Sequence, residues 1–187
     1  MEELRLLVNR CLKGEQTAML ALVERFQGQV FGLCYRMLGN REDAEDAVQE
    51  TFVRVLKNLA KWDHERDFEP WLFAIAGNRC RTALASRRRR PTNQAFIEPL
   101  PDRRPDATPA KLLAEELQLG LDQLRSDYRQ AFVLFHQHEL SYEQIAEAMS
   151  KPLGTVKTWI HRARTELIRF LHQREAIEDS RYAVRKI

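Results

Sequence analysis

The sequence predicts an all-α protein with two helical domains joined by a flexible linker, the second domain containing a helix-turn-helix. Three observations predict this fold. Apolar residues recur at steps of three and four along most of the chain, and no stretch shows the alternation of a β-strand. One central segment, residues 87–109, contains five prolines and few large apolar residues. Near the end of the chain, a short helical pattern, a break and a longer helical pattern follow one another.

Four helices are expected before residue 90. The first is short and ends near Gly14, and the second carries an apolar stripe from Met19 to Met37 that stops at Gly39 and Asn40. The third begins in an acidic run, NREDAEDAVQETFVRVLKNL. The fourth, in FEPWLFAIAGNRCRTALAS, is entered through Pro70, where proline suits a first helical turn.

The third expected helix shows a sharp charge contrast with the rest of the chain. Five carboxylates lie between Glu42 and Glu50, although the chain as a whole has a net charge of +3. Its apolar residues keep helical spacing, so one face belongs to the core and the carboxylates point away from it. Glu42 and Asp43 are explained by the helix dipole, which favours acids in the first turn. Asp46, Gln49 and Glu50 lie further along and share one edge of the helix.

The composition places the boundaries at residues 1–90 for the first domain, 91–110 for the linker and 111–172 for the second domain. A linker of this length reaches about 60–70 Å when extended, which is close to two turns of B-DNA. The two domains are therefore expected to work at separated places. The remaining tail, 173–187, either extends the last helix or is disordered.

The segment LSYEQIAEAMSKPLGTVKTWIHRARTELIRFL predicts the helix-turn-helix. Ser141 and Gln144 form a capping-box pattern at the start of the short helix, and SKPLG ends it. The outer face of the longer helix carries basic and hydroxyl side chains that suit phosphates and base edges: Lys157, Thr158, His161, Arg162 and Arg164. The alternative is an ordinary helical hairpin with a solvated basic face.

Other classes of function find little support in the sequence. The three cysteines, at positions 11, 34 and 80, are widely spaced among apolar residues, which favours buried thiols over disulfides or a zinc site. His136 and His138 are two residues apart on an expected helix and do not share a face. No phosphate-binding loop and no nucleophile–base pattern is found, so we expect no enzyme, no cofactor and no metal. Without an 18-residue apolar run or a signal-peptide pattern, a cytoplasmic protein that does not insert into membranes is expected.

Taken together, three segments resemble the extracytoplasmic-function (ECF, group IV) sigma factors of the sigma-70 family. They are DAEDAVQETF, FEPWLFAIAGNRCR and LSYEQIAEAMSKPLGTVKTWIHRARTEL, and they stand in the family's order across roughly residues 10–171. The resemblance implies sigma region 2 in the first domain and region 4 in the second. It also implies a protein that binds core RNA polymerase and directs promoter-specific transcription initiation by recognising −10 and −35 elements.

The resemblance assigns roles to individual residues. The docking contact with the β′ clamp helices of the polymerase falls to Asp46, Gln49 and Glu50. The −10 element falls to the fourth helix and the loop before it: Asn78 beside a pocket for a flipped base, Arg79 and Arg81 on phosphates with the run Arg87–Arg90, and Trp62 and Asp63 in the loop. The −35 element falls to Thr155, Lys157, Thr158, His161, Arg162 and Arg164, with the second domain resting on the β flap. An anti-sigma protein is a further partner that the resemblance implies.

The chain departs from the family pattern at a few positions. Ala74 stands where a basic residue is usual, and Trp159 replaces a frequent arginine. Ser150 and Lys151 replace the usual glycine and apolar residue of the turn, which is expected to keep its shape through Gly154.

Two alternatives belong to other classes. A stand-alone DNA-binding regulator would share the second domain, but it needs a receiver or ligand pocket in place of the acidic helix. A pure interaction protein would keep the acidic helix, but it has no need to present Lys157, His161 and Arg162 together.

Overall fold

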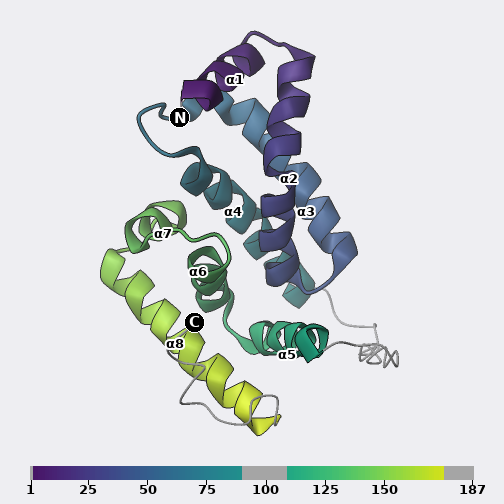
Figure 1. Ribbon diagram of the computed structural model, residues 1–187, viewed down its shortest axis with the longest axis vertical. Coiled ribbons are helices and arrows are strands. Elements are labelled where there is room, and N and C mark those ends of the chain that lie inside the picture. Colours follow the sequence, from purple (N-terminus) through teal and green to yellow (C-terminus); the bar gives the residue numbers. More distant parts are fainter. Residues whose placement is uncertain (1, 90–108, 175–187) are drawn as a thin grey trace.

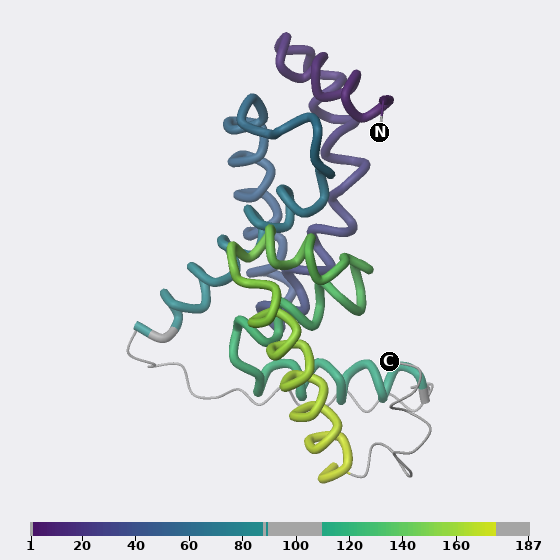
Figure 2. The backbone as a smooth tube through the Cα atoms, turned by 90° about the vertical axis from the view of Figure 1, so that its left-hand side faces the viewer, coloured from purple at the N-terminus to yellow at the C-terminus, as the bar shows by residue number. Residues whose placement is uncertain are grey.

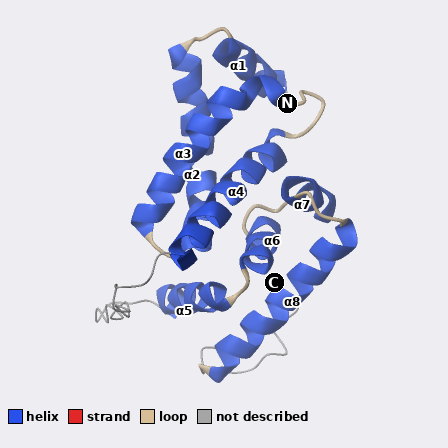
Figure 3. Cartoon of the chain, turned by 180° about the vertical axis from the view of Figure 1, so that it is seen from behind, coloured by secondary structure: helices blue, strands red, loops and turns tan. Residues whose placement is uncertain are grey.

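The computed structural model describes residues 2–89 and 109–174, and within them every regular element is helical (Figures 1 and 3). The elements are α1 (Glu2–Leu12), α2 (Gln16–Leu38), α3 (Arg41–Asn58), the 3₁₀ turn η1 (Leu59–Lys61), α4 (Phe68–Arg89), α5 (Pro109–Gln123), α6 (Ser126–His136), α7 (Tyr142–Met149) and α8 (Leu153–Gln173). The predicted all-α fold is confirmed. The first four helices form what we call the N-terminal lobe and the last four the C-terminal lobe.

The N-terminal lobe follows the local signals of its sequence. Gly39 ends α2 in the left-handed conformation, with φ of 77°, and its N–H donates to the carbonyl of Tyr35. Asn40 then caps α3, because its side-chain oxygen accepts from the N–H of Asp43 at 2.8 Å. In the core of this lobe, α2 packs against α1, α3 and α4. The third helix therefore exposes its acidic edge while Ala44 and Ala47 are buried.

The C-terminal lobe contains the predicted helix-turn-helix in α7 and α8. Ser141 and Gln144 form the full capping box at the start of α7. The turn after α7 is made by Ser150, whose φ of 51° is left-handed. Gly154 lies inside α8, so the expectation that this glycine shapes the turn was wrong. A serine can take this conformation at a modest energetic cost because its side chain is small and polar.

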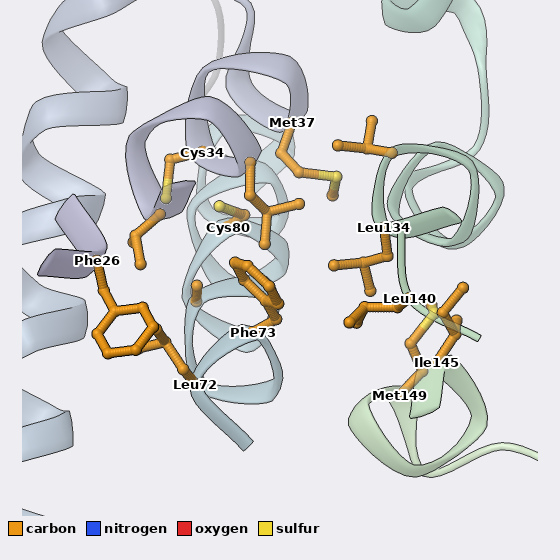
Figure 4. Packing of buried hydrophobic residues seen from close by; sticks show 14 of the residues in the cluster. Phe26, Cys34, Met37, Leu72, Phe73, Cys80, Leu134, Leu140, Ile145 and Met149 are labelled. Atoms are coloured by element: carbon orange, nitrogen blue, oxygen red, sulfur yellow. The ribbon is translucent and has the colours of Figure 1, made fainter. Parts of the chain in front are cut away.

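The two lobes pack directly against each other through one continuous apolar cluster. Met37 and Phe73 of the N-terminal lobe face Leu134, Leu140 and Ile145 of the C-terminal lobe in Figure 4. Helices α6 and α7 provide most of this contact, α6 against α2 and α7 against α4. Figure 2 shows the C-terminal lobe in front of the lower end of the N-terminal lobe and extending below it.

Close backbone approach at two glycines makes the lobe contact tight. A side chain at Gly77 of α4 would overlap the amide of Gln130 from α6, and one at Gly32 of α2 would overlap the amide of Gln137. Gln130 is fully buried, with 0% of its surface exposed. At Gly77 the contact therefore depends on the missing Cβ atom, whereas the exposed Gln137 side chain can move away from Gly32.

Polar side chains also cross the lobe boundary. Arg129 of α6 donates to the carbonyl of Met37 at 2.6 Å, which satisfies an open carbonyl at the end of α2. Arg66 donates to Glu147 of α7 at 2.6 Å, and Gln144 of α7 donates to Asp67 at 2.8 Å. Hydrogen bonds of this kind fix the relative orientation of the lobes, since each needs both lobes in place.

The predicted boundaries relate to these elements as follows. Most of the linker predicted at 91–110 lies outside the described residues, except that α5 already begins at Pro109. Of the tail predicted at 173–187, Gln173 ends α8 and the part from residue 175 on lies outside the described residues. The three cysteines are buried and free, as predicted. No helix among the described residues is long and apolar enough to cross a membrane.

Candidate protein-docking edge and nucleic-acid interfaces

The acidic edge of α3 is a continuous exposed surface. Asp46, Gln49 and Glu50 are all exposed, as their predicted role in docking requires. A groove of about 480 Å³ lies along the same edge and is lined by Gln49, Glu50, Val53, Arg54 and Lys57. The groove thus combines polar side chains with one apolar side chain, that of Val53, which is 51% exposed.

A second groove meets the first one at Gln49. It has a volume of about 460 Å³ and runs between α2 and α3, lined by Gln27, Gly28, Phe31, Arg41, Glu45, Val48 and Gln49. The candidate docking surface therefore combines carboxylates with apolar contacts from Val53 and Phe31. Sequence reasoning missed these two residues. Their only signal is that each is a large apolar residue beside a charged edge.

The predicted −10 residues of α4 are held by contacts within the protein. Arg81 donates to the side-chain oxygen of Asn78 and lies 3.8 Å from a carboxylate oxygen of Asp127 in α6. Arg79 forms a two-point ion pair with Glu50: Nε lies 2.6 Å from Oε2, and Nη2 donates to Oε1 at 2.7 Å. The structure therefore joins Arg79 to the candidate docking edge of α3.

The loop before α4 places its two candidate residues differently. Trp62 is 3% exposed, and its ring packs edge-on against Phe68 with centroids 5.1 Å apart. It is a core residue in this structure, whereas the resemblance assigns it to the −10 element. Asp63 is exposed, accepts from the N–H of Glu65 at 3.0 Å and pairs with Arg66 at 3.2 Å.

The loop that holds Trp62 and Asp63 and the side chain of Asn78 do not form one compact site in the structure. Asn78 lies ten residues after the start of α4 at Phe68, a separation of about 15 Å along the helix axis. Further along, Arg87 pairs with Asp43 and donates to the carbonyl of Leu38 at 3.1 Å. Arg90, which belongs to the predicted phosphate-binding run, lies outside the described residues.

The outer face of α8 presents most of the predicted −35 residues to solvent. Lys157, Thr158, His161 and Arg162 are exposed and Thr155 is half-buried, because Val156 and Ile160 turn the opposite face toward the core. A groove of about 400 Å³ on this face is lined by Tyr128, His161, Arg162, Thr165, Glu166 and Arg169. The helix thus offers a basic, outward surface of the size that a major groove admits.

Aromatic side chains support the cations of this face. Arg162 donates to the hydroxyl of Tyr128 at 3.0 Å, a bond that raises the pKa of Arg162. The ammonium of Lys157 lies 5.6 Å from the ring centroid of Tyr142. Tyr128 was not predicted as a site residue, and only its place in a helix preceding the motif could have suggested it.

Arg164 is the exception among the predicted −35 residues. It is half-buried and its Nη2 lies 3.3 Å from Nε2 of His136, so it points toward α6. Burial, with a further contribution from Arg164, lowers the pKa of His136 to about 4. A neutral imidazole can accept a hydrogen bond from the guanidinium, which fits a structural role for Arg164 between α6 and α8.

Comparison with known proteins places these surfaces in a family. Residues 22–90 match the model for sigma-70 region 2 and residues 114–167 match the model for sigma-70 region 4. The chain is 34% identical to the ECF RNA polymerase sigma factor SigW of Bacillus subtilis (strain 168), over 86% of this chain and 92% of that protein. The chain belongs to the ECF sigma factors. It is also 34% identical to the ECF RNA polymerase sigma-E factor of Escherichia coli (strain K12), over 86% of this chain and 90% of that one.

Solved structures show the same fold for this sigma factor. CnrH, solved in complex with the cytosolic domain of CnrY, matches with a TM-score of 0.68 and 27% identity over 90% of this chain and 97% of that chain. The sigma factor RpoE in complex with the anti-sigma factor NepR from Bartonella quintana matches with a TM-score of 0.69 over 81% and 95% of the two chains, at 23% identity. As a sigma factor, the protein is a transcription-initiation factor and not an enzyme, and its family domains imply core RNA polymerase and promoter DNA as partners.

Proposed function

We propose that this sigma factor docks on core RNA polymerase through the acidic edge of α3, reads the −10 element with α4 and reads the −35 element with α8. The observation that carries the proposal is the exposed edge Asp46–Gln49–Glu50 in region 2, together with the outward basic face of α8 in region 4. The α3 edge is acidic and suits a basic protein surface, whereas the α8 face is basic and suits a polyanion.

The β′ clamp helices of the polymerase are the proposed target of the α3 edge. A carboxylate opposite an arginine can form a charge-assisted bidentate pair, and removing one partner of such a buried pair costs about 2–5 kcal/mol. Val53 supplies apolar area beside the carboxylates, as the centre of a stable interface requires. These contacts would exclude water around the ion pairs and strengthen them.

For the −10 element we propose Asn78 as the side chain that reads a base. It is exposed on α4, and an amide both donates to and accepts from a base edge. Arg81 lies beside it and is the nearest candidate for a phosphate contact. Asp63 remains a candidate in the loop, while Trp62 holds that loop on the core.

For the −35 element we propose that the N-terminal half of α8 enters the major groove. Thr155, Lys157 and Thr158 lie in its first two turns, and His161 and Arg162 follow on the same outer face. The C-terminal lobe would rest on the β flap at the same time. Arg164 is left out of this contact because it faces His136.

Promoter use requires the lobes to separate. The two elements lie about two turns of B-DNA apart in the proposed complex, whereas here α6 and α7 contact α2 and α4 directly. We propose that the closed arrangement is the form of the free chain and that polymerase binding opens it. The similar CnrH and RpoE were solved with a partner protein, which supports an anti-sigma protein as a partner of this chain as well. The proposed place of action is the cytoplasm, where the polymerase works.

Transcription in vitro tests the proposal. The purified protein is added to core polymerase on a library of randomised promoter fragments, and the transcripts are sequenced. Transcripts that start downstream of a shared −35/−10 pair, and that are absent without the protein, are expected. Binding of the protein alone to duplex DNA, without core-dependent initiation, would instead support a stand-alone regulator.

A further inference from the structure

An ion pair joins the docking edge of α3 to the DNA-reading helix α4. Both oxygens of Glu50 face the guanidinium of Arg79, with N···O distances of 2.6 and 2.7 Å, although the residues are 29 positions apart in the sequence. The Glu50 side chain is 47% exposed, but that of Arg79 only 19%. The carboxylate is thus open to a partner, while the cation is largely covered.

The pair removes a positive charge from the −10 surface. A guanidinium binds phosphate through its charge and its planar fork of donors. Here Nε and Nη2 of that fork already face a carboxylate, and the charges of the pair sum to zero. A phosphate approaching α4 would therefore gain little from Arg79 while Glu50 remains in place.

We infer that docking on the polymerase releases Arg79 for the DNA backbone, so that Glu50 masks a −10 contact in the free sigma factor. A basic side chain of the polymerase that pairs with Glu50 competes with Arg79 for the same two oxygens. Once displaced, Arg79 stands next to Asn78 and two residues from Arg81, on the helix proposed to follow the −10 strand. This inference rests on the proposed docking of the α3 edge. Because coupling is reciprocal, DNA binding would strengthen polymerase binding by the same factor.

Single-stranded DNA binding by the full-length protein, without polymerase, tests the masking. The probe is a labelled oligodeoxythymidylate of about 15 nucleotides, since a phosphate contact does not depend on sequence. Glu50→Gln is expected to bind it about two- to fivefold more tightly than the native chain, the range of an exposed ion pair. The plot of log K against log salt should also become steeper by about 0.7, the value for one added phosphate contact on a single strand.

Asp46→Asn is the matched control. It removes one negative charge from the same edge, but within the described part of the chain the α3 carboxylates that form ion pairs are those of Asp43, Glu45 and Glu50. A general gain from lower negative charge would appear equally in both variants, whereas unmasking should appear only in Glu50→Gln. Arg79→Gln should cost much less affinity in the native background than in the Glu50→Gln background, where it should cancel the gain. Circular dichroism checks that each variant keeps its helical content.

Two results would overturn the inference. One is equal single-strand affinity of Glu50→Gln and Asp46→Asn. The other is a loss on Arg79→Gln that is as large in the native background as in the Glu50→Gln background, since Arg79 would then already be available. Binding of the same variants to core polymerase is measured separately. If neither Glu50→Gln nor Asp46→Asn weakens that binding, the proposed docking fails, while the single-strand data still decide whether Glu50 masks Arg79.

Discussion

The cations proposed to contact DNA have different partners in the two lobes. In the N-terminal lobe, arginines of α4 face carboxylates: Arg79 pairs with Glu50, and Arg81 lies near Asp127. In the C-terminal lobe, Lys157 and Arg162 of α8 face tyrosines, which leave their charges intact. If α8 reads the −35 element and α4 the −10 element, as proposed, the −35 reader is open to DNA at once, and the −10 reader is restrained until other contacts change.

The position of each restraint shows which event would relieve it. Glu50 belongs to the docking edge of its own lobe, and Asp127 belongs to α6 of the other lobe. Polymerase docking would remove the first contact and separation of the lobes the second. A sigma factor with both restraints would engage the −10 strand only after both events. Each of the following experiments alters one side of this comparison.

The largest effect is expected from reversing the docking edge. Asp46→Lys combined with Glu50→Lys should abolish binding to core polymerase, because two attractive pairs of about 2–5 kcal/mol each become repulsive. Co-elution with core polymerase measures this. The double variant Glu24→Lys and Glu115→Lys makes the same charge change at exposed positions of α2 and α5 and should still co-elute. Unchanged co-elution of the edge variant would contradict the docking.

The contact between the lobes should respond to Gly77→Ala. The added Cβ overlaps the amide of Gln130. This amide is buried and cannot move out into solvent, so the closed form should be destabilised by about 1–3 kcal/mol. The higher helix propensity of alanine acts on α4 in the closed and open forms alike, so it does not offset this destabilisation. Energy transfer between a dye on α1 and a dye on α8 should report a larger mean distance.

Gly28→Ala is the control for this experiment. Gly28 is also a helical glycine, but nothing lies within 4 Å of its Cβ position. It gains the same helix propensity without the overlap, so its dye distance should stay at the native value. Adding Gln130→Ala to Gly77→Ala should restore closure. A native distance in Gly77→Ala itself would mean that the lobes are not held by this contact.

Local signals in the sequence were enough to predict the helices, whereas the contact between the lobes could not be predicted from them. Capping residues such as Asn40 and Ser141 act within three positions, and apolar stripes repeat within one turn, so both are visible in a sequence. Gln130 against Gly77 joins positions more than fifty residues apart, and no local pattern marks either partner.

The candidate site was predictable to different degrees for a similar reason. Exposed edges follow from helical phase, and this placed Asp46, Gln49 and Glu50 correctly on the surface. Trp62 lies in an irregular loop, where no period separates a core aromatic from an exposed one. The pairing of Arg79 with Glu50 depends on how α3 and α4 pack, which sequence spacing does not reveal.

A pH effect of about 2 kcal/mol is expected from His138, which lies at the lobe boundary with its ring centroid 4.4 Å from that of Phe73. Burial lowers its pKa to about 4 from an ordinary 6.5. Between these values the unfolded chain binds a proton that the folded chain does not. Stability is therefore complete above pH 6.5 and falls as the pH drops toward 4, by about 2 kcal/mol between pH 7 and pH 5.

Denaturant unfolding at pH 7 and pH 5 measures this effect. His138→Gln removes the titrating ring, so its free energy of unfolding should depend less on pH than that of the native chain by about this amount. Asp67, Glu69 and Glu139 line the same cleft and are present in both proteins, so their contribution cancels in the comparison. An equal pH dependence in the two proteins would show that His138 takes up its proton in the folded chain as easily as in the unfolded one.

The smallest effect is expected from the tyrosine that supports the −35 reader. Tyr128→Phe removes the hydroxyl that accepts from Arg162, which should weaken binding to a −35 duplex by about 1 kcal/mol, or roughly fivefold. Arg162→Ala sets the scale, with an expected loss of about 1–3 kcal/mol if the guanidinium reads bases. If Arg162 reads a base, both variants should relax preference at the same base pair. Equal losses on every sequence would make Arg162 a phosphate contact, and an unchanged Tyr128→Phe would mean that DNA alone orients the guanidinium.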